Sequence, residues 1–501
     1  MPSGIKIQGG FDVGLLTRRK VLAGFLAGVA APAWAEAPLT SIRPPRRGMA
    51  EPDAGAQALV AAAKLTGELG YITADLTTGR ILEQHGADQL MPPASVTKAV
   101  TALFALEKLG VDHRFVTRVM RVGEVVNGRL DGDLILAGGG DPELDTDKLA
   151  DLVALLAQTG LREVTGRFIV YTGALPERAE IANDQPDYVG YNPSISGLIL
   201  NFNRVNFVWK QVGQDYQIAM NAEGARSVPP VSMASMQLVN RDAPLFAYEA
   251  GEGLDRWSVS RAALGKAGGR WLPVRHAGEY AAQVFAWHAN AQGIKLPTAE
   301  VTRDLPPQAI EIVRREGEPL PEVLRKMLKF STNLTAEAVG LTASGAGTQA
   351  GSAAVMTSWA RRKFAITGRF GDHSGLGPVS RISPADMMAV MIGARRDPHG
   401  AMLHDLVRNL GLADANGKAQ DKADVRVHAK SGTMNFVSNL AGYVTAPNGR
   451  ELAFAVFTAD LPRRAAVPIA QRESPEGDAA WVRRARRLNG LMVRRWAQLY
   501  L

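Results

Sequence analysis

A chain of 501 residues is too long for one simple hydrophobic core and indicates two or three domains. Its 46% hydrophobic and 21% charged residues are typical of a soluble globular protein, and its net charge of +8 suits an anionic surface or polymer without requiring one. There is no cysteine, which excludes disulfides and thiolate metal sites.

The N-terminus has the pattern of an export signal. Arg18, Arg19 and Lys20 precede an apolar run that ends at Ala31, and residues 33–35 fit a small-x-small cleavage site. Adjacent arginines before a mild apolar core resemble a twin-arginine signal, and the alternative is an ordinary secretory signal. The run is short for a membrane anchor, and no later stretch is apolar enough to span a bilayer. We predict that residues 1–35 are a signal peptide and that the mature chain is periplasmic.

A hairpin and a helix are the first elements predicted after this signal. Residues 36–55 are rich in Pro, Arg and Ala and predict an extended lead-in. Two β-prone runs within residues 70–85, separated by Thr78 and Gly79, predict a hairpin. A helix then begins near Ser95 and ends at Gly110. Its inward stripe consists of Val96, Val100, Leu103 and Leu106.

Residues 111–320 change to short strands separated by turn signals. Strands are predicted at 134–137, 167–171, 196–207 and 208–219, and helices at 147–159 and 280–290. The glycine triplet at 138–140 lacks a following Gly-Lys-Ser/Thr. It is therefore predicted to be a turn and not a phosphate-binding loop.

Helical patterns return after residue 320. Helices are predicted at 321–329, 352–364 and 384–395, a strand at 425–433, and a hairpin at 440–457 that turns at 447–449. Residues 481–501 form a basic amphipathic helix, which either lies on a membrane surface or packs on the sheet with its basic face in solvent; the second is favoured. This order predicts one domain, from residues 36–110 and 321–501, interrupted by a strand-rich region of one or two domains at 111–320.

The chemistry is indicated by three short motifs that occur in this order: Ser95-x-x-Lys98, Ser331-x-Asn333 and Lys430-Ser431-Gly432. Three residues are almost one helical turn, so the side chains of Ser95 and Lys98 share a helix face and the amine can take the hydroxyl proton. Each motif alone is weak, and a second Ser-x-x-Lys begins at Ser3. The order of the three motifs and the strand at the third make the set specific.

With these motifs the chain resembles the serine penicillin-recognising enzymes. Within them it is similar to the D-alanyl-D-alanine carboxypeptidase/endopeptidase family, the class C low-molecular-mass penicillin-binding proteins. The resemblance rests on residues 93–98, 136–144, 371–376, 381–384 and 429–433, and on the long insertion between the first and second motifs. It implies an α/β (α+β) fold of the serine transpeptidase/β-lactamase-like type, an antiparallel sheet with helices interrupted by a strand-rich insertion.

Two residues depart from the family pattern. Ser431 stands where threonine is common, which keeps the hydroxyl group. His373 stands where glycine is usual, which either alters a loop near the cleft or is tolerated.

The resemblance implies a role for each motif residue. Ser95 would be the nucleophile and Lys98 its base, which has to be neutral; burial and the nearby Lys430 cation would favour the neutral amine. Ser331 would relay a proton towards the leaving amine. Asn333 would hold both Lys98 and the amide of the substrate.

The resemblance implies that the third motif binds the substrate. Lys430 and Ser431 suit a terminal carboxylate, which a D-Ala-D-Ala peptide and a penicillin both present. The backbone N–H groups of Ser95 and Thr433 would form the oxyanion hole. No cofactor is expected, and no metal, because the histidines show no spacing such as His-Glu-x-x-His.

Other interpretations of these residues are weaker. Ser95 can be only a helix N-cap with Lys98 a solvated first-turn lysine, but the other two motifs argue against it. Asp372, His373 and Ser374 spell a Ser-His-Asp triad, yet adjacent residues do not point at one another as a triad requires.

We therefore predict an exported serine D-Ala-D-Ala carboxypeptidase that acts on peptidoglycan stem peptides through an acyl-enzyme on Ser95. The resemblance adds an endopeptidase activity on D-Ala-diaminopimelate cross-links and acylation by β-lactam antibiotics; no nucleic-acid partner is expected. One alternative is a β-lactamase or esterase with the same motifs, although such enzymes are typically smaller and lack so large an insertion. The other is a non-catalytic peptidoglycan-binding protein, against which the intact motifs argue.

Overall fold

The computed structural model describes residues 55–414, 416, 418–420 and 425–501. The predicted signal peptide at 1–35, and the lead-in as far as residue 54, lie outside these described residues. In the part of the chain that is described, no helix has both the length and the apolar character needed to cross a membrane.

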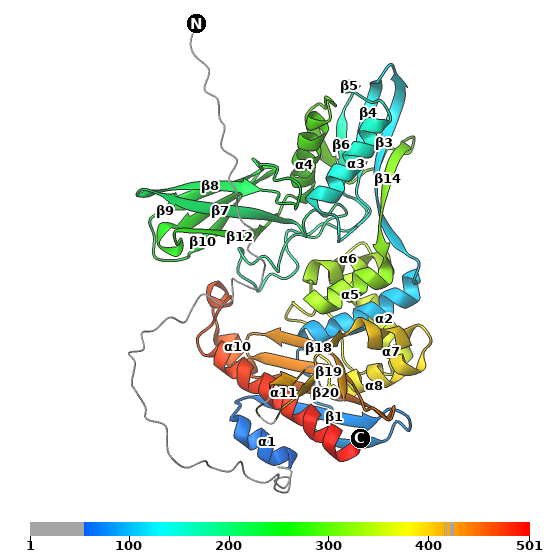
Figure 1. Ribbon diagram of the computed structural model, residues 1–501, viewed down its shortest axis with the longest axis vertical. Coiled ribbons are helices and arrows are strands. Elements are labelled where there is room, and N and C mark those ends of the chain that lie inside the picture. The colour runs from blue at the N-terminus through cyan, green and yellow to red at the C-terminus, as the bar shows by residue number, and fades with distance from the viewer. Residues whose placement is uncertain (1–54, 415, 417, 421–424) are drawn as a thin grey trace, which may run out of the picture. The chain divides into compact units, whose positions relative to one another are not determined.

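A six-stranded antiparallel sheet combines strands from the two ends of the described chain (Figure 1). Its order is β15-β18-β19-β20-β1-β2. β1 pairs with β20 along its whole length, from Glu68 opposite Ala459 to Asp75 opposite Leu452. The predicted N-terminal and C-terminal hairpins are therefore confirmed, and they belong to one sheet. The strands are β1 (Glu68–Asp75), β2 (Ile81–His85), β15 (Arg408–Asn409), β18 (Arg426–Met434), β19 (Val437–Thr445) and β20 (Glu451–Ala459).

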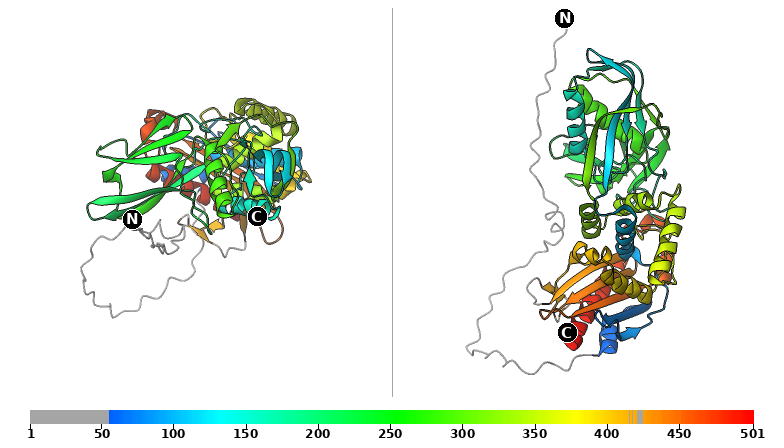
Figure 2. Two further views of the ribbon diagram at one scale, coloured as in Figure 1. Left: turned by 90° about the horizontal axis from the view of Figure 1, so that it is seen from above. Right: turned by 90° about the vertical axis from the view of Figure 1, so that its right-hand side faces the viewer.

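Alternation along β20 separates the two faces of this sheet. Ala455 and Phe457 pack into a core that includes α2 (Thr97–Leu109) and α8 (Pro384–Arg396), whereas Phe454 and Val456 face α11 (Asp478–Tyr500). The helical core on the first face also takes in α5 (Leu320–Phe330), α6 (Asn333–Ser344) and α7 (Gln349–Phe364). Helices thus cover both faces of the sheet, as the right-hand view of Figure 2 shows.

The C-terminal helix α11 packs its apolar face on the sheet, beside α1 (Ala56–Ala63). Met492 and Trp496 are fully buried there, while Arg483, Arg484 and Arg487 are exposed. The favoured interpretation, a helix packed on the sheet with a basic face in solvent, is confirmed. Since the protein itself covers the apolar side chains, they are not available to a membrane.

Residues 114–319 form three further sheets. Their orders are β13-β6-β4-β3-β14, with β5 beside β4, then β12-β7-β8 and β10-β11-β9. Together with α3 (Thr146–Gln158) and α4 (Ala277–Ala291) they enclose a second large core. The strands are β3 (Arg114–Val126), β4 (Arg129–Ala137), β5 (Glu163–Val164), β6 (Phe168–Tyr171), β7 (Arg204–Val212), β8 (Asp215–Asn221), β9 (Ala234–Val239), β10 (Phe246–Gly251), β11 (Leu254–Ser260), β12 (Ala267–Pro273), β13 (Ala299–Thr302) and β14 (Ile310–Pro319).

The first and last long strands of this region lie side by side. β3 and β14 are antiparallel, with Arg114 opposite Pro319. β3 follows α2, and β14 runs directly into α5, so the chain leaves and rejoins the helical core at neighbouring points. The domain boundaries at residues 110 and 320 stay a prediction, which this pairing supports.

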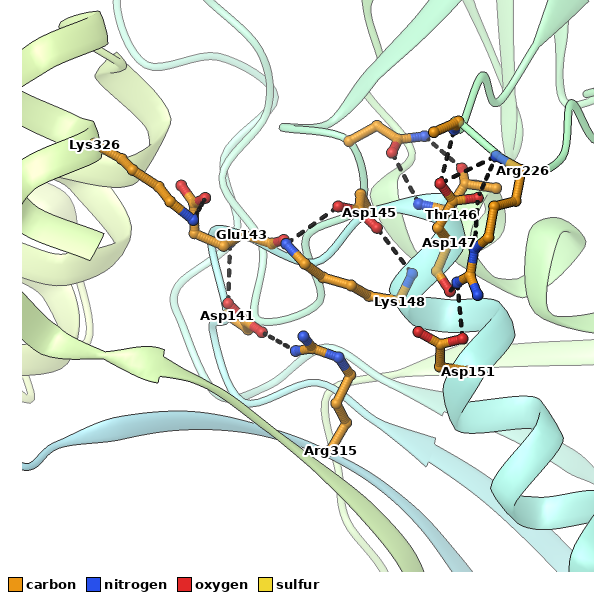
Figure 3. A network of polar contacts seen from close by, with 12 residues as sticks. Asp141, Glu143, Asp145, Thr146, Asp147, Lys148, Asp151, Arg226, Arg315 and Lys326 are labelled. Carbon is orange, nitrogen blue, oxygen red and sulfur yellow. Dashed lines mark hydrogen bonds and ion pairs between the residues drawn. The ribbon is translucent and has the colours of Figure 1, made fainter. Parts of the chain in front are cut away.

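Charged side chains tie the segment just before α3 to β14 and α5 (Figure 3). Glu143 pairs with Lys326 of α5 at 3.1 Å, and Asp141 pairs with Arg315 of β14 at 3.4 Å. Asp141 is buried, which raises the pKa of its carboxyl group. The glycine triplet leads into this network: a Cβ at Gly139 would lie 2.1 Å from the backbone oxygen of Val116, so only glycine can pass β3 so closely. The triplet serves close packing, in keeping with the interpretation as a turn.

Two neighbouring strands, predicted at 196–207 and 208–219, have the wrong bounds. Residues 196–203 form no strand; β7 begins only at Arg204, and its hairpin with β8 turns at Gly213, inside the run predicted as the next strand. Asn201, Phe202 and Asn203 all have φ near +50°, which no strand adopts. The Asn203 side chain accepts from the Leu200 N–H and donates to the Ser194 carbonyl, so it takes the place of a neighbouring strand.

Candidate active site

Ser95 lies in a tight turn that the sheet holds in place. It is the middle residue of a short 3-10 turn, Ala94–Val96, which leads into α2. The buried Asn439 of β19 donates from its amide nitrogen to the carbonyls of Pro92 and Pro93, at 2.8 and 2.9 Å. A Cβ at Gly432 would lie 3.0 Å from Ser95 N, so β18 passes directly beside the Ser95 backbone N–H.

Lys98 is fully buried behind this turn. Its Nζ lies 2.8 Å from Ser95 Oγ, 2.7 Å from Asn333 Oδ1 and 2.7 Å from the Ser374 carbonyl oxygen. Burial is the largest cause, and the Lys430 cation the second largest, that hold the pKa of Lys98 well below its ordinary value. The two carbonyl oxygens can only accept, so when the amine is neutral they take both of its N–H groups. Its lone pair is then left for the Ser95 hydroxyl, which is the arrangement of a general base and its nucleophile.

Two buried carboxylates lie near Lys98. Glu337 accepts from the backbone N–H of Ser374 at 2.9 Å, and Asp372 accepts from those of Gly375 and Gly377, both at 2.6 Å. Both carboxylates raise the pKa of Lys98, against the effect of its burial. Burial raises the pKa of each carboxyl group in turn. Neither residue was predicted as part of the site; Glu337 lies one helical turn after Asn333, and that spacing was the available signal.

The second and third motifs meet across the site. Ser331 ends α5 in the left-handed region, with φ of 58°, and lies in the short connection between α5 and α6. Lys430 of β18 donates to Ser331 Oγ at 3.0 Å and to the Ser431 carbonyl at 2.7 Å. Burial lowers the pKa of Lys430 to about 7. Lys430 therefore points at Ser331, and it can give up or accept a proton near neutral pH.

Asn333 joins three parts of the site. Its Oδ1 accepts from Lys98, and its Nδ2 donates to the backbone carbonyl of Tyr191 at 2.9 Å. The predicted contact with Lys98 is present in the structure. One amide N–H is used on Tyr191, which leaves one for a substrate.

A cleft of about 410 Å³ opens in front of these residues. Ser95, Ser331, Asn333, Ser431 and Thr433 line it, whereas Lys98 and Lys430 lie buried behind its wall. The structure thus brings all the residues predicted for the site together. It also adds residues that no motif indicated: Gln185, Tyr191, Arg464, Arg472 and Arg486.

A family model agrees with this geometry. The model of the D-Ala-D-Ala carboxypeptidase 3 (S13) family matches residues 56–475, most of the chain. The chain belongs to this family. The predicted family and the prediction of a serine-type D-Ala-D-Ala carboxypeptidase are thereby confirmed.

Relatives of known identity match most of this S13 chain. The D-alanyl-D-alanine carboxypeptidase DacB of Haemophilus influenzae is 25% identical over 419 residues, which cover 78% of this chain and 85% of the relative. A D-alanyl-D-alanine carboxypeptidase of an Actinomadura species is 29% identical over 429 residues, 77% of each chain.

A solved structure shows the same fold. Penicillin-binding protein 4 (dacB) from Haemophilus influenzae aligns with a TM-score of 0.72 over 88% of this chain and 99% of its own, at 21% identity. A second structure of that protein, in complex with a β-lactam, aligns with a TM-score of 0.68 at 22% identity. The predicted penicillin-recognising fold is confirmed.

In this S13 chain the loop at residues 184–192 reaches the cleft. The carboxylate of Asp184 lies 2.9 Å from Arg472 and 3.4 Å from Arg464, the latter in α10 (Leu461–Ala466). Gln185 and Tyr191 of the same loop line the cleft, and the Tyr191 hydroxyl donates to Gln185 Oε1 at 3.2 Å. Part of the region predicted as an insertion therefore forms a wall of the site.

His373 takes no part in the cleft. Its ring is fully buried, with Nε2 2.6 Å from Ser352 Oγ of α7 and Nδ1 beside Met356. A Cβ at Gly340 would lie 2.1 Å from this ring, so a glycine of α6 provides the space for the histidine. For His373 the sequence left two outcomes open, an altered loop near the cleft or a tolerated substitution. The structure favours the tolerated substitution. A triad with Asp372 and Ser374 is excluded, because the two ring nitrogens of His373 contact Ser352 and Met356 instead.

Proposed function

We propose that this S13 enzyme is exported and cleaves D-Ala-D-Ala termini of peptidoglycan stem peptides with Ser95 as its nucleophile. The observation that carries the proposal is the buried amine of Lys98. Its Nζ lies 2.7 Å from two carbonyl oxygens and 2.8 Å from Ser95 Oγ, so that in the neutral amine the N–H groups go to the carbonyls and the lone pair is left for the Ser95 hydroxyl. A serine hydroxyl becomes a useful nucleophile only when such a base takes its proton.

Acylation follows from this pair. Ser95 Oγ attacks the carbonyl carbon of the penultimate D-alanine while its proton passes to Lys98. The carbonyl oxygen becomes an oxyanion, for which we propose the backbone N–H groups of Ser95 and Thr433 as donors. The contact of β18 with Ser95 N supports this pairing, and losing one such donor costs roughly 100- to 1000-fold in rate.

The leaving amine needs a proton. Ser331 can deliver its hydroxyl proton to that nitrogen and take one from Lys430, at 3.0 Å. The C–N bond then breaks, free D-alanine leaves, and the peptide stays as an ester on Ser95. Lys98 then loses the Ser95 proton to solvent, and Lys430 regains one from solvent. Neutral Lys98 takes a proton from a water molecule as that water attacks the ester carbonyl; the ester C–O bond breaks, and Lys98 returns the proton to Ser95 Oγ.

The wider setting is part of the same proposal. Residues 1–35 serve as a twin-arginine signal to the periplasm, where stem peptides and their cross-links occur. Residues 36–110 and 321–501 form the catalytic domain, and residues 111–320 are inserted in it. Cleavage of D-Ala-diaminopimelate cross-links and acylation by β-lactams use the same Ser95; the β-lactam complex of penicillin-binding protein 4 supports the second.

Labelled penicillin and an acyl-D-Ala-D-Ala peptide test this function. The mature enzyme should bind the label covalently and release D-alanine, while Ser95→Ala should do neither. Ser474→Ala, at an exposed serine, should behave as the wild type. Equal labelling of Ser95→Ala contradicts the proposal, and penicillin turnover without D-alanine release indicates a β-lactamase instead.

A further inference from the structure

The lysine of the third motif lies buried behind the cleft wall. Lys430 Nζ is directed at Ser331 Oγ and at the Ser431 carbonyl, and the residue is only 4% exposed. With a pKa lowered to about 7 by burial, it carries only part of its charge at neutral pH. Lys430 suits the proton relay better than it suits a permanent cation for the terminal carboxylate of the substrate.

A permanent cation lies at the other end of the same motif. Arg486 of α11 lines the cleft with Ser431 and Thr433, and its Nη2 donates to Thr433 Oγ1 at 3.0 Å. Arg486 is exposed and forms no ion pair with any other described residue. A guanidinium has five N–H donors and stays charged at all working pH values, so most of its donors remain for a ligand.

The other charged groups of the cleft wall are already engaged. Arg464 and Arg472 share the carboxylate of Asp184. Glu473 pairs with Arg270, and Asp478 accepts from the Phe436 N–H at 2.7 Å. Arg486 is thus the arginine of the described cleft wall that forms no ion pair with a carboxylate.

We propose that Arg486, together with the hydroxyls of Ser431 and Thr433, binds the carboxylate of the leaving D-amino acid. The inference rests on the proposed function and deepens it. It assigns Lys430 to proton transfer and the C-terminal helix to substrate selection.

Two acyl-D-Ala-D-Ala peptides separate this role from a general effect, one with a free C-terminal carboxylate and one with a carboxamide. For Arg486→Gln, kcat/KM on the carboxylate peptide should fall on the order of 10-fold, while kcat/KM on the carboxamide should stay close to the wild-type value. The fall should lie mainly in KM for the carboxylate peptide if the charge pair forms in the bound substrate. Arg486→Lys, which keeps the charge, should recover part of the loss.

Arg487→Gln is the matched control, because Arg487 is the next residue of α11, is exposed and does not line the cleft. It should leave both peptides unaffected. An equal fall on both peptides, or no fall on either, in a folded Arg486→Gln overturns the assignment. A wild type that cleaves neither peptide contradicts the proposed function itself, and the role of Arg486 falls with it.

Discussion

At the scale of single residues, a lysine amine is neutral near physiological pH only where its surroundings disfavour the ammonium form. Around Lys98, burial and the Lys430 cation lower the pKa, whereas Asp372 and Glu337 raise it. The pH at which Lys98 becomes a base is therefore a balance of opposing charges. Removing one charge should move that pH in a direction set by its sign.

Lys430→Met removes the cation, so the pKa of Lys98 should rise. Protonated Lys98 cannot take the Ser95 proton, and the acylation rate therefore falls on the acid side of the Lys98 pKa. In the variant this fall should begin at higher pH than in the wild type. The effect should be largest below about pH 7, where Lys430 of the wild type is charged. The measurement is the rate of acylation by labelled penicillin across the pH range.

The position of the acid limb is the readout here, since Lys430→Met also lowers the maximal rate through the proton relay. Asp372→Asn should shift the acid limb in the opposite direction. Burial raises the pKa of Asp372 to about 7, so the wild-type group is charged mainly above that pH. Losing its charge should lower the pKa of Lys98 and move the limb to lower pH, with the largest effect above about pH 7. A limb that shifts the same way in both variants would contradict the assignment of Lys98 as the base.

At the scale of helices and strands, periodicity and turn residues predicted much of the fold. The apolar stripes at 321–329, 352–364 and 384–395 became α5, α7 and α8 with ends within a few residues. The strand predicted at 196–207 failed for a physical reason. Ile195, Leu198 and Leu200 are as buried as strand residues, yet asparagine side chains satisfy the backbone there. The amino-acid composition of a segment predicts whether it is buried, but it does not predict which groups form hydrogen bonds with its backbone.

Packing of α6 against the loop at 371–376 predicts that one substitution destabilises the wild type but not a variant that lacks the His373 ring. Gly340→Ala would raise the helix propensity of α6 by about 1 kcal/mol, but its Cβ would collide with the His373 ring. The variant should therefore be less stable, by about 1–3 kcal/mol, as overpacked cores are. In a His373→Gly background the collision is gone, and the same substitution should be neutral or stabilising.

A double-mutant cycle measures this coupling by thermal or urea unfolding. His373→Gly alone is destabilising, because it leaves the space now filled by the ring and removes the bond to Ser352 at 2.6 Å. The cycle compares the effect of Gly340→Ala with and without the His373 ring, so the destabilisation caused by His373→Gly itself cancels. Additive effects of the two substitutions would show that Gly340 does not make room for His373.

At the scale of the whole molecule, the cleft is assembled from segments far apart in the chain. The three motifs predicted the residues that carry the chemistry, because that chemistry requires particular side chains. Tyr191 could not be predicted, since it bonds Asn333 through a backbone carbonyl that any residue type could supply. Asn439 was missed as well, because its role depends on the position of the turn that it holds. Residues that act by placement become visible only in the folded chain.

Asp184 tests the attachment of the 184–192 loop to the cleft. Its carboxylate lies between Arg464 and Arg472, and all three side chains are at most 15% exposed. Asp184→Asn keeps the shape but leaves two largely buried guanidinium groups without a counter-charge, which should cost about 1–3 kcal/mol. The unfolding temperature should fall, and KM for peptides should rise, because Gln185 and Tyr191 of the same loop line the cleft.

Asp151→Asn is the control, because it makes the same exchange in an ion pair that is exposed on both sides, and it should leave stability nearly unchanged. If the two variants unfold alike, the Asp184 contacts do not hold the loop, and the wall of the cleft has to be supported by its other contacts, such as the bond between Tyr191 and Asn333.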